Sequence, residues 1–209
     1  MDFKKLANQY RDELLDNVLP FWLEHSQDIE FGGYFSCLDR EGKVFDTDKF
    51  IWLQGREVWM FSMLYNKVEK RQEWLDCAVQ GGEFLKKYGH DGNYNWYFSL
   101  DRSGRPLVEP YNIFSYTFAT MAFGQLSLAT GSQEYADLAK KTFEIILSKV
   151  DNPKGKWNKL HPGTRNLKNF ALPMILCNLA LAIEHLLDPG YLEQTMETWL
   201  KIISGVIIT

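Results

Sequence analysis

Apolar residues recur at helical spacing along most of the chain. Near the start, an apolar residue appears every four positions, which predicts a helix with one apolar face built from Leu6, Tyr10, Leu14, Val18 and Trp22. Pro20 falls inside this helix and predicts a kink or an early end there. The same periodicity predicts further helices over about residues 53–68, 72–88 and 113–129.

The second half of the chain continues the helical pattern. Gly131 and Ser132 predict the end of one helix and the N-cap of the next, which carries apolar residues from Tyr135 to Val150. Residues 152–156 predict a turn, and a sixth helix is expected over about 167–187, with Pro173 in an early turn. Asp188-Pro189-Gly190 predicts the start of a seventh helix, with a cap and a first-turn proline.

Two short stretches break this pattern and resemble each other. Each is aromatic and β-prone, and each turns at Asp-Arg-x-Gly, first in residues 33–43 and again in residues 96–105. The second tip follows the first by 62 positions, with two helices between them. Both stretches predict β-hairpins. Helix pairs joined by small hairpins predict a partial α/α toroid spanning residues 1–209, with an atypical apolar tail from about Leu200.

Composition narrows the function classes. The net charge of −4 and the pI of about 5.6 argue against a basic nucleic-acid binder. A mean hydropathy of −0.29 and polar residues throughout the longest uncharged stretch, residues 110–133, argue against a membrane protein. The N-terminus lacks the apolar core of a secretory signal, which favours a cytoplasmic protein. The three cysteines are far apart and predict reduced, mostly buried thiols at Cys37, Cys77 and Cys177.

Familiar site motifs are absent from the sequence. There is no phosphate-binding glycine loop and no metal-binding histidine motif, so we expect no metal; Gly81-Gly82 is expected to allow close helix packing. A surface or capping role is expected for each of the separated histidines His25, His90, His161 and His185. A pair of carboxylates for glycoside hydrolysis stays open, with candidates near predicted loops at Glu24, Asp28, Glu30, Asp46 and Asp48.

The most informative segment is Lys49 to Met60. Trp52, Arg56 and Trp59 fall on one helical face. One interpretation is a structural arginine paired with Glu57 or another acid, because an unpaired buried guanidinium is costly. The other is an arginine in an aromatic sugar pocket, where it would bind an oxygen that becomes negative during a reaction. The spacing alone favours neither.

Several segments resemble one family in order along the chain. They are Phe21–Ser26, Gly32–Phe35, Arg40–Val44, Trp52–Trp59, Gly81–Leu85, Ile113–Ser115 and Ala171–Met174. Together they resemble the N-acylglucosamine 2-epimerases, also called renin-binding proteins, up to about Leu192. The resemblance implies the N-terminal half of an (α/α)6 toroid, usually a homodimer. It also implies interconversion of N-acetylglucosamine and N-acetylmannosamine without a required cofactor, with ATP or another nucleotide as an activator.

The resemblance also implies roles for single residues. Arg56 corresponds to a catalytic, pocket-lining arginine of the family, and Trp52 to a tryptophan beside the sugar. Pro173-Met174 favours the N-acylhexosamine branch over related epimerases and isomerases. The family's catalytic histidines lie in the second half of a protein about twice this length, and their motifs are missing here. Two alternatives therefore stay open: an inactive fragment that pairs or binds through an exposed face, and a toroid glycosidase.

Overall fold

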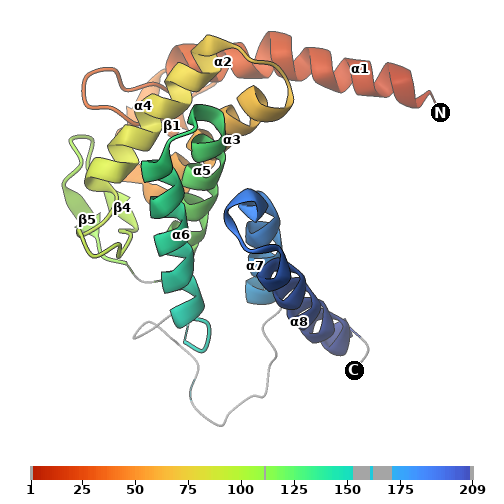
Figure 1. Ribbon diagram of the computed structural model, residues 1–209. Helices are drawn as coiled ribbons and strands as arrows, with labels where there is room; N and C mark the ends of the chain where they lie inside the picture. Colours follow the sequence, from red (N-terminus) through yellow and green to blue (C-terminus); the bar gives the residue numbers. More distant parts are fainter. Residues whose placement is uncertain (1, 111, 153–160, 162–170, 208–209) are drawn as a thin grey trace.

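The computed structural model describes residues 2–110, 112–152, 161 and 171–207 (Figure 1). Its helices are α1 (Phe3–Glu13), α2 (Leu19–His25), α3 (Ile51–Lys67), α4 (Gln72–Tyr88), α5 (Phe114–Thr130), α6 (Gln133–Ser148), α7 (Ala171–Ala182) and α8 (Pro189–Ile207). A π turn (Leu14–Val18) joins α1 to α2, and a short 3-10 turn (Glu184–Leu186) precedes α8. The predicted helices are confirmed where they are described; the turn at 153–156 and the start of the sixth helix at 167–170 lie outside the described residues.

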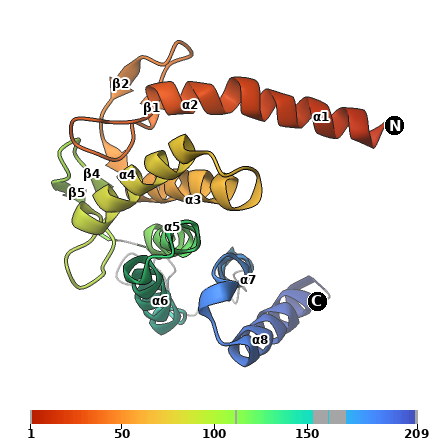
Figure 2. The ribbon, with the colours of Figure 1, turned by 45° about the horizontal axis from the view of Figure 1, so that its top comes forward.

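The helices from α3 onward form two curved rows. Figure 2 shows α3, α5 and α7 side by side in one row, with α4, α6 and α8 in a second row outside it. The sequence explains this layering. Most of α5 is apolar or small and is buried, whereas α4 and α6 each bury one face and expose a charged one. Each outer helix packs on its inner neighbour, as expected for a repeated helix pair.

The interruption predicted at Pro20 is present as a π turn. Proline has no backbone N–H and cannot donate to the residue four positions earlier. The chain shifts its hydrogen bonding by one residue just before Pro20, so that the Leu19 N–H donates to the Leu14 carbonyl. The helix therefore continues to His25 instead of ending. Its predicted apolar face is largely exposed, with Tyr10 70% accessible, and only its last member, Trp22, packs against the core.

Both predicted hairpins are confirmed. β1 (Cys37–Leu38) pairs antiparallel with β2 (Val44–Asp46), and β4 (Ser99–Leu100) with β5 (Pro106–Val108). The two tips share one conformation: Gly42 and Gly104 have φ of +82° and +94°, in the left-handed region that glycine favours. The sequence did not indicate β3 (Lys49–Phe50), which pairs with β4 and begins immediately before α3.

The ends of the helices test several finer predictions. Gly131 ends α5 at φ +72°, and Asp188 accepts a hydrogen bond from the Gly190 N–H at the start of α8, as predicted. Ser132 occupies the N-cap of α6, but its side chain makes no capping hydrogen bond. α8 runs through the apolar tail as far as Ile207. None of the described helices combines the length and apolar character needed to cross a membrane.

Candidate functional site

The first turns of α3 present the candidate site. α3 begins at Ile51, directly after β3, so Trp52 and Arg56 lie one helical turn apart on the same face. The Arg56 guanidinium carbon lies 5.8 Å from the centre of the Trp52 ring. Arg56 is exposed, and no carboxylate in the described part of the chain lies within ion-pairing distance of it. The structure therefore brings the two predicted residues together.

A second ring against Arg56 comes from the neighbouring inner helix. The guanidinium carbon lies 5.2 Å from the ring centre of Phe118 on α5. The Trp52 and Phe118 rings are 6.2 Å apart and tilted by 48°. Sequence reasoning missed Phe118 and expected Trp59, which instead packs against the core. We call Trp52, Arg56 and Phe118 the arginine cluster.

Glu57 is not the partner of Arg56, which corrects one of the two sequence interpretations. Its Oε1 atom lies 2.5 Å from the hydroxyl oxygen of Ser26, just after α2. Neighbouring residues on a helix point about 100° apart, so Glu57 faces the loop after α2 while Arg56 faces α5. The guanidinium is left free to attract a negatively charged or polar oxygen, supported by the faces of two rings.

The Ser26 hydroxyl lies within hydrogen-bond distance of both Glu57 and the Trp22 carbonyl. Its oxygen also lies 2.6 Å from the Trp22 carbonyl oxygen, which can only accept. A hydroxyl has one proton, so when Ser26 donates to Trp22, a protonated Glu57 completes the chain by donating to Ser26. Burial raises the pKa of Glu57 to about 8, although a hydrogen bond donated by Ser26 to the carboxylate would lower that pKa.

Asp28 has a structural role. Its buried carboxylate lies 2.9 Å from Lys49 Nζ and 3.0 Å from Arg102 Nε. It also accepts hydrogen bonds from the backbone N–H groups of Glu30 and Phe31. Burial by itself raises the pKa of Asp28, but the hydrogen bonds from Arg102 and Lys49 outweigh it and hold that pKa below its usual range. Asp28 thus ties the loop after α2 to β3 and to the second hairpin.

The other candidate acids do not form a hydrolytic pair. Glu24 is 76% exposed, and Glu30 lies 2.9 Å from Arg102. Asp46 is exposed, whereas Asp48 is partly buried; burial and the neighbouring Asp46 raise the pKa of Asp48. Asp28 is engaged by Lys49 and Arg102 and Glu30 by Arg102, so these acids give the glycosidase interpretation no specific support.

The cysteines and histidines, for which the sequence predicted no catalytic role, lie in separate parts of the structure. Cys37, Cys77 and Cys177 are free thiols, of which Cys77 is fully buried. His25 packs on Phe21, and His185 lies 3.4 Å from the Ser127 hydroxyl. Within the described ranges, no three histidine, cysteine or acidic side chains gather as a metal site would require. Gly82 allows close helix packing as predicted, because an added Cβ atom would meet Leu126 on α5, whereas Gly81 makes room for the ring of Tyr34, which is not in a helix.

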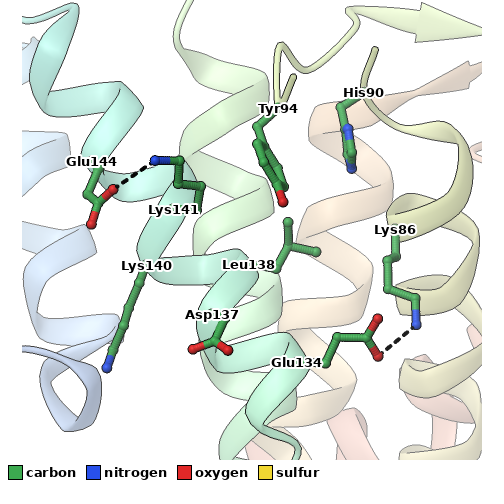
Figure 3. A pocket seen from close by; sticks show the side chains of 9 residues that line it. All are labelled: Lys86, His90, Tyr94, Glu134, Asp137, Leu138, Lys140, Lys141 and Glu144. Atoms are coloured by element: carbon green, nitrogen blue, oxygen red, sulfur yellow. Dashed lines mark hydrogen bonds and ion pairs between the residues drawn. The ribbon is translucent and has the colours of Figure 1, made fainter. Parts of the chain in front are cut away.

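A groove of about 680 Å³ lies elsewhere, between the outer helices α4 and α6. Figure 3 shows Leu138 between two ion pairs, Lys86 with Glu134 and Lys141 with Glu144, whose charged atoms lie 3.1 Å and 3.3 Å apart. The aromatic wall is His90 stacked on Tyr94. Its lysines and carboxylates are balanced in number, so the groove does not select a ligand by charge. The arginine cluster does not line it.

Comparison of the sequence with known proteins identifies related epimerases. A family model described as N-acylglucosamine 2-epimerase matches residues 33–208. The N-acylglucosamine 2-epimerase of Bos taurus is 42% identical over 170 residues, which cover 79% of this chain and 40% of that protein. The cellobiose 2-epimerase of Dictyoglomus turgidum is 29% identical over 167 residues, covering 76% and 42% respectively.

Solved structures of epimerases superpose on this chain. The solved structure of cellobiose 2-epimerase from Spirochaeta thermophila superposes with a TM-score of 0.79 at 20% identity, covering 95% of this chain and 53% of that one. This confirms the predicted fold, half of an (α/α)6 toroid. The chain spans about two fifths of the length of the curated relatives it matches. From its family model, its helix pairs and its Trp-Leu-Gln-Gly-Arg segment, the chain belongs to the N-acylglucosamine 2-epimerase family.

Proposed function

We propose that this chain forms the sugar-binding side of an epimerase that interconverts N-acetylglucosamine and N-acetylmannosamine. The observation that carries the proposal is the arginine cluster: an exposed guanidinium without a carboxylate partner, held against two aromatic rings. Aromatic faces suit the apolar C–H surface of a sugar, and a guanidinium suits its oxygens. The family of the chain and its 42% identity to a mammalian N-acylglucosamine 2-epimerase support this substrate class.

The chemistry assigns Arg56 a specific task. Inversion at C2 of the open-chain sugar removes the proton next to the C1 carbonyl, passes through an enolate and returns a proton on the opposite face. Negative charge develops on the C1 oxygen during this step. A guanidinium already placed at that oxygen stabilises the enolate without having to reorganise. Trp52 would lie beside the sugar and fix its orientation.

Two further groups are needed, a base on one face of C2 and an acid on the other. We place both in the part of the toroid that these 209 residues do not span, since the histidine motifs of the family are missing from this sequence. The same proposal includes a cytoplasmic homodimer activated by a nucleotide such as ATP. These assignments rest on the resemblance of the sequence to the family.

Sugar binding tests the core of the proposal directly. Saturation-transfer NMR on the 209-residue chain would measure contact with N-acetylmannosamine, using wild type, Arg56→Ala and Trp52→Ala. We expect a signal in wild type and its loss in both variants. Arg71→Ala is a matched control, because Arg71 also packs on a tryptophan, with its guanidinium carbon 4.8 Å from the Trp74 ring centre. A sugar signal that survives in Arg56→Ala would refute the role of Arg56.

Turnover is measured separately. Loss of the C2 proton of N-acetylmannosamine in D2O, with ATP present, would show that the chain supplies its own acid and base, against our placement of these groups. An unchanged C2 proton together with sugar binding is the expected result. Release of reducing sugar from oligosaccharides, without epimerisation of monosaccharides, would instead support the glycosidase alternative.

A further inference from the structure

α3 and α5 approach each other closely at Gly55, immediately before Arg56. A Cβ atom at Gly55 would lie 2.9 Å from both the carbonyl carbon and the carbonyl oxygen of Phe118, and 3.1 Å from its Cβ. Most of these atoms belong to the backbone and cannot rotate away. Any side chain at position 55 would therefore push α5 away from α3, so the present spacing of the two helices depends on glycine.

This spacing determines where the guanidinium lies. Trp52 is on the same helix as Arg56 and moves with it, but Phe118 is on the neighbouring helix. The 5.2 Å separation between the guanidinium carbon and the Phe118 ring centre can therefore exist only while α5 stays in close contact at Gly55. An arginine side chain has four rotatable bonds, and two flanking rings restrict it far more than one does.

We infer that Gly55 and Phe118 are positioning residues for Arg56: glycine admits the α5 backbone, and the Phe118 ring then holds the guanidinium for the sugar oxygen. The inference rests on the proposed function for its purpose, but its geometry can be tested without turnover. Neither residue acts on substrate in this scheme. Both act through the orientation of Arg56.

The NMR signal of the Arg56 Nε–Hε group reports this geometry. A proton held over an aromatic face is shifted to high field by the ring current, and Arg56→Lys identifies the signal by removing it. The full 209-residue chain would be measured at mildly acidic pH, where this proton exchanges slowly with water. We expect Phe118→Leu to move the signal to lower field, Phe118→Tyr to retain the wild-type position because the ring remains, and Gly55→Ala to produce a low-field shift.

Gly82→Ala is the matched control for a general packing defect. Gly82 is also a helical glycine at a helix contact, but its added Cβ would meet the side chain of Leu126, away from the arginine cluster. It should leave the Arg56 signal in place. If Gly55→Ala does not fold while Gly82→Ala does, the backbone contact at Gly55 is shown to be the less tolerant of the two, as expected when the neighbouring atoms cannot rotate away. The two Phe118 variants then decide the ring contact.

The outcomes separate the positioning role from the proposed function. An Arg56 signal that is unchanged in Phe118→Leu, or that moves equally in Gly82→Ala and Gly55→Ala, overturns the positioning role. Adding N-acetylmannosamine to wild type tests the function. If the signal responds to Phe118→Leu but not to sugar, the positioning role stands and the sugar-binding proposal fails. If the wild-type signal responds to sugar but does not respond to Phe118→Leu, the sugar-binding proposal stands and the positioning role fails.

Discussion

Replacing Glu57 with glutamine should stabilise the protein at neutral pH. Glu57 is partly buried beside Ser26, and burial raises its pKa from the ordinary 4.5 to about 8. In the unfolded chain the carboxyl group is ionised above pH 4.5, so folding near neutral pH must return a proton to it. A glutamine side chain needs no proton, and its amide N–H can donate to Ser26 as the protonated carboxyl group does.

The size of the effect follows from proton linkage. Below pH 4.5 both states are protonated, and the two proteins should have similar unfolding free energies. Between pH 4.5 and about 8 only the unfolded wild type is ionised, so its unfolding free energy falls relative to Glu57→Gln by up to about 1.4 kcal/mol per pH unit. From pH 5 to pH 7 this amounts to about 2–3 kcal/mol, an upper bound because water still reaches part of the side chain.

Urea unfolding followed by tryptophan fluorescence would measure the difference at pH 5, 6, 7 and 8. Comparing the two proteins at each pH cancels the contributions of all other titrating groups. The control Glu24→Gln removes a carboxylate from a side chain that is 76% exposed, and so reports the effect of losing a surface charge alone. The slope of the unfolding free energy against denaturant should stay the same in all three proteins.

A difference between Glu57→Gln and wild type that does not grow with pH would refute the reasoning. Folding would then not return a proton to Glu57, and the assignment of Ser26 as donor to the Trp22 carbonyl would fail with it. Lower stability of the glutamine variant at every pH would point instead to an ionised Glu57 that Ser26 stabilises. The sign of the pH dependence therefore decides between two opposite hydrogen-bond patterns.

Three other substitutions test the remaining structure. Asp28→Asn should destabilise the protein by about 3–5 kcal/mol, because it leaves the buried Lys49 without its counter-ion; since the pKa of Asp28 is lowered, this difference should shrink in urea titrations as the pH falls below 3.8. Phe61→Ala should cost about 3–5 kcal/mol in the same assay, because the ring is completely buried in α3, and a loss below 1 kcal/mol would contradict this packing. Arg56→Ala should change the unfolding free energy by about 0.5 kcal/mol or less, because the side chain is exposed; a large loss would show that its main role is structural.

The sequence predicted what depends on neighbours along the chain. Helix positions follow from apolar periodicity, and both hairpin tips follow from Asp-Arg-x-Gly, because these signals lie within a few residues of one another. The pairing of Trp52 with Arg56 was predictable for the same reason, since one helical turn separates them. By contrast, Phe118 contacts Arg56 from another helix. Whether the Glu57 carboxyl group contacts Arg56 or Ser26 depends on how α2 packs against α3, which the sequence does not show.

Charge was the least predictable feature. From the sequence, Asp28 was one of several candidate acids near predicted loops, yet it binds Lys49 and Arg102 from two distant segments. Nothing in the residues around Asp28 marks it as buried, because Lys49 and Arg102 lie 21 and 74 positions away along the chain. Recognising it from sequence would require knowing the pairing of β3 with β4, and two-residue strands leave too weak a pattern for that.

The link between Asp28 and Arg102 has a consequence for how the protein unfolds. Stacked helix pairs in open repeat proteins can fray from one end, since each pair contacts only its neighbours. Here an ion pair spans 74 positions of sequence and fastens the loop before the first hairpin to the tip of the second. Amide hydrogens from residue 26 to residue 105 should therefore exchange with solvent as one cooperative unit, with the exposed α1 opening separately and first. The two similar hairpin tips therefore differ in role, because Arg102 binds Asp28 whereas its counterpart Arg40 is exposed at the surface.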